Sequence, residues 1–178
     1  MNDFFDSEIG IPVSSKTLHG ILIENHMKGK NFDDIVDKQL VNLPFQVIPA
    51  KKNGKQKRYL IGTTALIKTD GDYIIFALSE TDPYTCKANC DVATMWLALE
   101  KLLDRGRIES GDYPINFPLV GSGQSGVGLS GRDLINLLIL SIITSTKIKR
   151  ITGKIRIILN KELFEEIDLR TIKKHWEG

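Results

Sequence analysis

The sequence predicts an α/β protein in three layers (α/β/α), with helices on either side of a mixed, largely parallel sheet. Two observations favour this fold class. From residue 73 onward, strand-like and helix-like patterns alternate three times, and parallel strands need helical crossovers of this length. The chain has 178 residues, shows no linker or internal repeat, and therefore suits one domain around a single core.

The first part of the chain combines short helices with polar turns. Apolar residues at helical spacing predict helices over residues 17–27 and 32–40. Asn31 precedes the second helix as a suitable N-cap, and two aspartates fall in its first turn. Residues 58–69 are expected to form a strand, followed by a tight turn at residues 69–72.

The alternating part begins with a strand over residues 73–79, which is apolar enough to be buried on both faces. A polar loop over residues 80–89 and a helix over residues 91–105 follow.

The last two strand–helix units enclose a glycine-rich segment. Strands are expected at residues 113–120 and 151–159, and helices at residues 132–147 and 161–175. The segment between the first of these strands and its helix, residues 121–128, is called the glycine loop below. In parallel α/β sheets, ligands bind beyond the carboxyl ends of strands, where this loop lies.

The overall charge argues against a nucleic-acid partner, because the net charge is only +2. One basic cluster surrounds an Asn-Gly turn and is expected to be a solvated hairpin tip, with phosphate or partner binding as the alternative. Its members are Lys51, Lys52, Lys55, Lys57 and Arg58.

Membrane and metal classes are disfavoured as well. The longest apolar run, residues 134–143, contains Asn136 and Ser141 and is too short to cross a bilayer, and the acidic start does not resemble a signal peptide. We therefore expect a cytoplasmic chain without membrane contact of its own. Cys86 and Cys90 have no nearby histidine to complete a zinc site, so we expect free thiols and no metal.

The glycine loop is suited to bind phosphate. Glycine tolerates positive φ, so several backbone N–H groups can converge on one anion, and the following helix adds its own free N–H groups. A plain tight connection is the alternative. The spacing of Gly121, Gly123 and Gly126 matches the dinucleotide fingerprint Gly-x-Gly-x-x-Gly. That motif requires an acidic ribose ligand at the end of the next strand, about 20 residues on, but the one strand that follows ends at residues 159–160, which is much too far away. The P-loop and nucleophile-elbow patterns also fail.

Several short segments, taken in order, resemble macro domains. There, an apolar strand ending in proline leads to a loop that wraps the diphosphate of ADP-ribose, as residues 115–123 are placed to do here. The closest resemblance is to the macro domain of type II Thoeris antiphage effectors, supported by residues 5–7, 16–20, 59–63 and 77–79. It implies one macro-like domain over residues 1–178, in which the usual N-terminal strands are lacking or replaced.

The resemblance implies a sensor without a cofactor. In type II Thoeris, a TIR-domain enzyme consumes NAD and makes a histidine–ADP-ribose signal, which the effector's macro domain binds. The implied partner is thus a small-molecule nucleotide, an ADP-ribose derivative. A full-length effector carries membrane helices that place it at the inner membrane. A free-standing sponge that sequesters the signal is the alternative.

The resemblance also implies the ligand-binding residues, with no catalytic residue among them. The diphosphate loop comprises Gly121, Ser122, Gly123, Gln124, Ser125, Gly126, Val127 and Gly128. The side facing the ribose or its substituent comprises Asn2, Phe5, Asp6, Ser7, Ser79, Glu80 and Lys87. For several of these residues a structural role is the alternative to ligand binding. Phe5 could be part of the core, Asp6 a turn residue or helix cap, and Ser79 a turn residue. Glu80 and Lys87 could simply be solvated at the surface.

Two other functions are weighed against the sensor. An ADP-ribosyl hydrolase is suggested by the shared fold and by Asp6 and Asp112 near expected strand ends, although no nucleophile–base pair is evident. An oligomerisation module is the other, and the sequence leaves open whether the chain forms a homo-oligomer.

Overall fold

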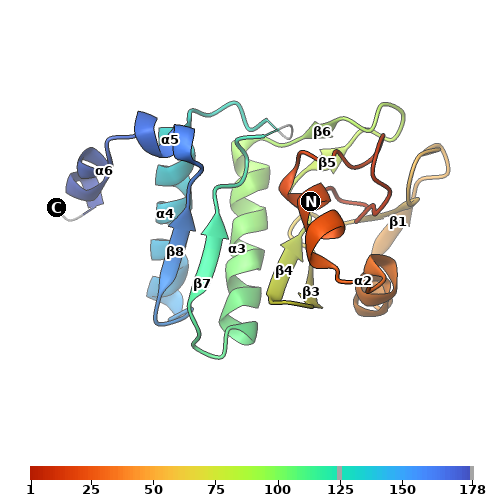
Figure 1. Cartoon of the computed structure of the whole chain (residues 1–178), viewed down its shortest axis with the longest axis horizontal. Coiled ribbons are helices and arrows are strands. Elements are labelled where there is room, and N and C mark those ends of the chain that lie inside the picture. Colours follow the sequence, from red (N-terminus) through yellow and green to blue (C-terminus); the bar gives the residue numbers. More distant parts are fainter. Residues whose placement is uncertain (124–125, 177–178) are drawn as a thin grey trace.

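Helices and strands are interspersed along the chain, whose computed structural model describes residues 1–123 and 126–176 (Figure 1). The helices are α1 (Leu18–Ile21), the π-helical turn η1 (Leu22–His26), α2 (Phe32–Leu40), α3 (Val92–Glu109), α4 (Gly131–Ile148), α5 (Lys161–Glu166) and α6 (Leu169–Trp176). The strands are β1 (Phe45–Val47), β2 (Lys57–Tyr59), β3 (Thr64–Lys68), β4 (Asp72–Phe76), β5 (Glu80–Thr81), β6 (Ala88–Asn89), β7 (Ile115–Pro118) and β8 (Ile155–Ile158). The predicted α/β class is confirmed.

The strand pairing corrects the expectation of a largely parallel sheet. The pairs β1–β2, β3–β4 and β5–β6 are antiparallel, and only β7–β8 is parallel, with Ile115 opposite Ile155. The cause is local, because strands joined by short turns can pair only in the antiparallel sense. Within the described ranges no ladder joins β4 to β7, although Figure 1 shows both strands pointing toward the same edge.

Two hydrophobic clusters fill the interior. In the larger, Met95 and Leu99 of α3 and Leu134 and Leu138 of α4 are fully buried and pack with Phe117 of β7. The smaller packs α2 against the β3–β4 hairpin. The larger cluster therefore supports the strand and the helix on either side of the glycine loop.

Local capping explains where several helices begin. Asn31 accepts hydrogen bonds from the backbone N–H groups of Asp33 and Asp34, which confirms the predicted cap and the predicted bounds of α2. Asp91 and Ser130 cap α3 and α4 in the same way. Each cap satisfies a donor that the helix itself leaves free.

Two predicted elements are divided in the structure. The strand expected over residues 58–69 is interrupted at Gly62, whose φ of +83° lies in the left-handed region, so β2 pairs with β1 while β3 pairs with β4. The helix expected over residues 161–175 is broken at Asp168, whose carboxylate accepts from the backbone N–H of Arg170 and thereby starts a new helix, α6.

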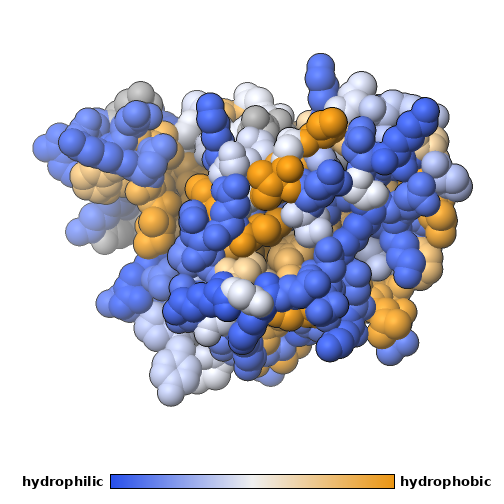
Figure 2. Space-filling model, turned by 45° about the vertical axis from the view of Figure 1, so that its right-hand side comes forward, coloured by the Kyte–Doolittle hydropathy of each residue, from blue (hydrophilic) through white to orange (hydrophobic). Residues whose placement is uncertain are grey.

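The surface is mostly hydrophilic on the face that Figure 2 presents, with apolar residues gathered near the middle of the view. Large apolar side chains around β1 and β2 remain exposed, among them Val41, Phe45, Val47 and Leu60. None of the helices in the described part of the chain has the length and apolarity needed to cross a bilayer.

We predict that a side chain added at Gly121 destabilises the fold, whereas a side chain added at Gly123 does not. Gly121 has φ +89°, and an added Cβ would lie 3.0 Å from Val127, 3.1 Å from Met95 and 3.2 Å from Leu134. Gly121→Ala should therefore lower the free energy of unfolding by about 1–3 kcal/mol. An added Cβ at Gly123 meets nothing within 4 Å, so Gly123→Ala should change it by less than about 0.5 kcal/mol. Urea denaturation measures both, and equal effects would contradict the prediction.

Candidate functional site

The glycine loop lies at the carboxyl end of β7 and leads to the N-terminus of α4 (Figure 1). Gly121, Gly126 and Gly128 have φ values of +89°, +31° and +74°. The N–H of Gly126 donates to the carbonyl of Gly123 over 3.0 Å, and the N–H of Val127 donates to that of Gly121 over 3.5 Å. Two of the loop's carbonyl groups are thus used within the loop itself. The predicted ligand residues Gln124 and Ser125 lie outside the described residues.

One side of the loop is anchored in the core and the other is open. Gly121 and Val127 are buried, and Val127 belongs to the larger hydrophobic cluster. Ser122 is exposed, and a Cβ added at Gly123 or Gly126 would meet no atom within 4 Å in the part of the chain that the structure describes. A ligand can therefore approach the backbone of the loop from the open side.

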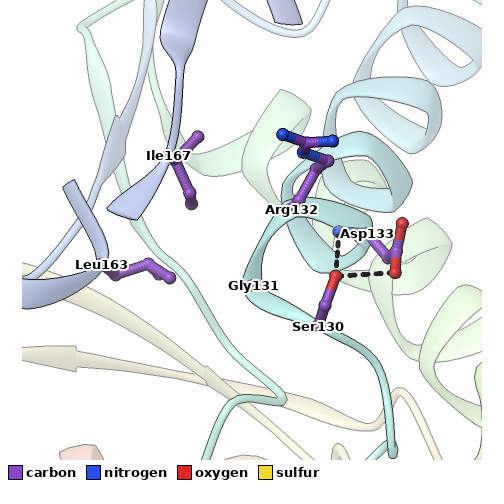
Figure 3. Close-up of a pocket in the computed structure, with 6 residues that line it drawn as sticks. All are labelled: Ser130, Gly131, Arg132, Asp133, Leu163 and Ile167. Carbon is purple, nitrogen blue, oxygen red and sulfur yellow. Dashed lines mark hydrogen bonds between the residues drawn. The ribbon is translucent and has the colours of Figure 1, made fainter. Parts of the chain in front are cut away.

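A cavity of about 400 Å³ adjoins the start of α4. Figure 3 shows the side chains of Leu163 and Ile167 on one side and those of Ser130, Arg132 and Asp133 on the other. The hydroxyl of Ser130 accepts from the backbone N–H of Asp133 over 3.2 Å and donates to its carboxylate over 2.7 Å (Figure 3). The cavity thus combines an apolar wall with a helix N-terminus and the exposed cation Arg132.

The predicted ligand residues of the N-terminal segment are mostly internal. Asp6 is fully buried, and its carboxylate accepts from Asn2 Nδ2 over 2.8 Å, from Lys51 Nζ over 2.9 Å and from the backbone N–H of Lys55 over 2.6 Å. Asn2 is also buried. Phe5 is fully buried and meets Tyr59 edge to face, with ring centroids 5.8 Å apart.

Ser7 is the partly exposed member of this segment, and its hydroxyl donates to Asp33 Oδ2 over 2.7 Å. Ser79 is buried and bridges to Asn2 in the parallel sense at the end of β4. This bridge brings the N-terminal segment to the carboxyl edge of β4, the same edge of the molecule at which the glycine loop lies (Figure 1).

The other two predicted residues lie on the β5–β6 hairpin and are exposed. Glu80 lines a second cavity of about 440 Å³, whose other walls include Asp3, Phe45, Arg58 and Leu60. The described lining of that cavity does not include the glycine loop. Neither Glu80 nor Lys87 forms an ion pair with any residue that the structure describes.

The basic cluster is not the solvated hairpin tip that its sequence predicts. Lys51 is fully buried and pairs with Asp6, while Lys55 pairs with Asp33 and Asp37. Arg58 pairs with Asp3, with its Nε 3.1 Å from Oδ2. The hairpin itself is present as β1–β2, and Lys52 and Lys57 are exposed as expected. The other three cations pair with acidic residues distant in the chain, which a local pattern does not reveal.

Two titratable groups near this segment, the buried Asp3 and the half-buried His19, have shifted pKa values. Burial raises the pKa of Asp3 to about 6, despite the opposing effects of Thr81 and Arg58. Burial also lowers the pKa of His19 to about 3, and the positive charge of Lys55 adds to that effect. His19 packs beside Phe32 with ring centroids 5.9 Å apart. In the described residues, no group of three or more His, Cys, Asp or Glu is arranged to hold a metal ion.

A parallel strand pair, a glycine-rich turn and a capped helix define the class of this protein: an α/β domain with a glycine-rich loop between the carboxyl end of a strand and the start of a helix. The family model for the macro domain of the Thoeris protein ThsA matches residues 1–160. The chain belongs to this ThsA macro domain family, and the resemblance found in the sequence is confirmed. No curated protein matches the chain significantly.

We predict that His19 makes the fold sensitive to acid. Its pKa of about 3 in the folded state lies below the unfolded value of 6.5, so the unfolded state takes up a proton first as the pH falls. The stability of the wild type relative to His19→Leu should therefore decline by up to about 2 kcal/mol between about pH 7.5 and about pH 5.

The comparison uses urea denaturation of both proteins at both pH values. Asp3 acts in the opposite direction, because its raised pKa of about 6 gives a contribution that is lost as the pH rises through this value. That contribution cancels in the difference between the two proteins. A difference that does not change with pH would contradict the prediction, because it would show that His19 has the same pKa in the folded and unfolded states.

Proposed function

We propose that this domain binds a nucleotide derived from ADP-ribose, with the diphosphate on the glycine loop. The observation that carries the proposal is the open side of the loop, where an added Cβ at Gly123, Gly126 or Gly128 has no neighbour within 4 Å among the described residues. Membership in the ThsA macro domain family supports a small-molecule nucleotide as the ligand. Two linked phosphate groups match the concave backbone that such glycines allow.

The start of α4 supplies further attraction for an anion. In its first turn, Ser130 already accepts from the N–H groups of Asp133 and Leu134, which leaves those of Gly131 and Arg132 to bind an anion. The exposed guanidinium of Arg132 makes no ion pair with the described residues. The adjoining cavity has an apolar wall of Leu163 and Ile167, which suits the flat face of a nucleoside. We therefore place the diphosphate on the loop and one nucleoside end in this cavity.

More specifically, we propose that the ligand is histidine–ADP-ribose, made from NAD by a TIR-domain enzyme. The chain would then act as the sensor part of an antiphage effector. Its family supports the link to Thoeris. A histidine moiety carries a carboxylate and an imidazole, for which Lys87 and Glu80 on the β5–β6 hairpin are exposed partners. A free-standing sponge for the same signal would use the same contacts.

The hydrolase alternative gains no support from the two aspartates that suggested it. Both oxygens of Asp6 already accept hydrogen bonds in the interior. Asp112 lies before the amino end of β7, away from the glycine loop, and pairs with Arg150 at the surface. We therefore propose binding without catalysis.

Gly123→Glu should abolish binding of ADP-ribose, because a carboxylate would occupy the place of the diphosphate. The Cβ that the substitution adds has no neighbour within 4 Å among residues 1–123 and 126–176, so we expect the variant to fold. Gly71→Glu is the matched control, because it adds the same charge in the β3–β4 turn, at the opposite end of the molecule (Figure 1). Isothermal titration calorimetry of the wild type and both variants measures the effect. No heat from the wild type at high micromolar ADP-ribose, or equal binding by Gly123→Glu, would reject the proposal.

The wild type should bind histidine–ADP-ribose at least about tenfold more tightly than ADP-ribose, because the extra carboxylate gains a charged partner. Lys87→Met should remove this preference and leave the affinity for ADP-ribose unchanged. Lys154→Met, another exposed lysine, is the control. Competition calorimetry with the two ligands gives the ratio, and a preference that survives in Lys87→Met would assign the histidine end to other residues.

A further inference from the structure

The N-terminal segment, residues 2–7, is joined to the β1–β2 hairpin by an ion pair that has no access to water. The ammonium of Lys51 lies 2.9 Å and 3.0 Å from the two carboxylate oxygens of Asp6, and both side chains are fully buried. The same ammonium lies 4.5 Å from the centroid of the Phe4 ring. A buried charge is tolerated only with such partners, so the segment and the hairpin must dock together.

The hairpin loop is shaped to let this pair form. Gly54 has φ +80°, and a Cβ added there would lie 2.2 Å from Asp6 Oδ1 and 2.8 Å from Lys51 Nζ. The next residue, Lys55, donates its backbone N–H to Asp6 Oδ1 over 2.6 Å. The turn therefore brings the hairpin backbone, as well as the lysine side chain, onto one carboxylate.

Asp6 also sets the shape of its own segment. Its carboxylate accepts from the Asn2 amide, and its backbone N–H donates to Asn2 Oδ1 over 3.2 Å. Phe5, between them, has φ +52°, a conformation that a residue with a side chain adopts only when its surroundings impose it. The isolated bridge from Asn2 to Ser79 then places the segment at the carboxyl edge of β4.

We infer that Asp6 and Lys51 are positioning residues for ligand binding: the buried pair holds residues 2–7 at the edge that carries the glycine loop, without touching the ligand. The inference rests on the proposed function. It also makes the affinity for the ligand depend on Lys51, a residue of the hairpin loop that the glycine-loop motif does not include. If the pair affects ligand affinity only by holding the segment in place, removing either partner should cost the same affinity as removing both.

A double-mutant cycle on ligand affinity tests this inference. Lys51→Met, Asp6→Asn and the double variant are titrated with ADP-ribose by calorimetry, at a temperature at which circular dichroism shows each to be folded. Each single variant should bind at least about tenfold more weakly, and the double variant should bind no more weakly than the singles. Lys52→Met, an exposed neighbour in the same hairpin loop, should stay within about twofold of the wild type.

Amide hydrogen exchange of the ligand-free proteins gives an independent readout. In Lys51→Met and in Asp6→Asn, exchange should accelerate at Lys55 N–H, which donates to Asp6, and at Tyr59 N–H, which donates to the carbonyl of Asp3. Exchange in α4 should not change. Because Asp6→Asn keeps the shape of the side chain, it remains informative even if Lys51→Met does not fold.

The outcomes separate the two proposals. Weaker binding in Asp6→Asn with unchanged binding in Lys51→Met would mean that Asp6 contacts the ligand directly, and unchanged affinity in both would mean that the pair serves stability alone. Either result overturns the inference and leaves the proposed function standing. Accelerated exchange in the variants, with no binding of ADP-ribose even by the wild type, would instead overturn the proposed function and with it any role of the pair in binding.

Discussion

One buried carboxylate, that of Asp6, organises the N-terminal half of the chain. It lies in the interior with the ammonium of Lys51, and the two residues are separated by 45 positions in the sequence. Removing two charges from water is costly unless each finds its partner, so this contact requires the segment and the hairpin to fold as a unit. Arg58 also pairs with the buried carboxylate of Asp3, while Lys55 pairs at the surface with Asp33 and Asp37 of α2, where water weakens such contacts.

The other half of the chain is held together by a different kind of interaction. The glycine loop is attached through Val127 and Gly121, which pack with Met95 and Leu134 in the larger apolar cluster. Apolar packing has no charge to screen or titrate, whereas ion pairs depend on protonation. The edge that we assign to the ligand is therefore built from two supports: a loop fixed by packing and an N-terminal segment fixed by charge.

The sequence was sufficient where structure is decided locally. The helix over residues 32–40, its Asn31 cap and the passage from strand through glycine loop to helix all follow from short-range signals that the structure repeats. It was insufficient where distant residues decide. In the sequence, the cations of the β1–β2 hairpin resemble a solvated turn. In the folded protein, three of them pair with aspartates near the N-terminus and in α2. The division at Gly62 of the strand expected over residues 58–69 likewise depends on tertiary pairing, because β2 pairs with β1 and β3 pairs with β4.

A motif fixes the place of a residue more reliably than the direction of its side chain. By order along the chain, Asp6 belongs to the residues expected to face the ribose or its substituent, yet its carboxylate points to the interior, where three donor groups already bind it. Gly123 has no side chain, so its role in the loop depends only on the position of its backbone. The described residues leave open space where its Cβ would lie. A glycine loop whose backbone N–H groups can bind an anion can therefore be recognised from sequence. The role of a carboxylate near that loop depends on which cation it pairs with in the folded protein, and the sequence does not give that partner.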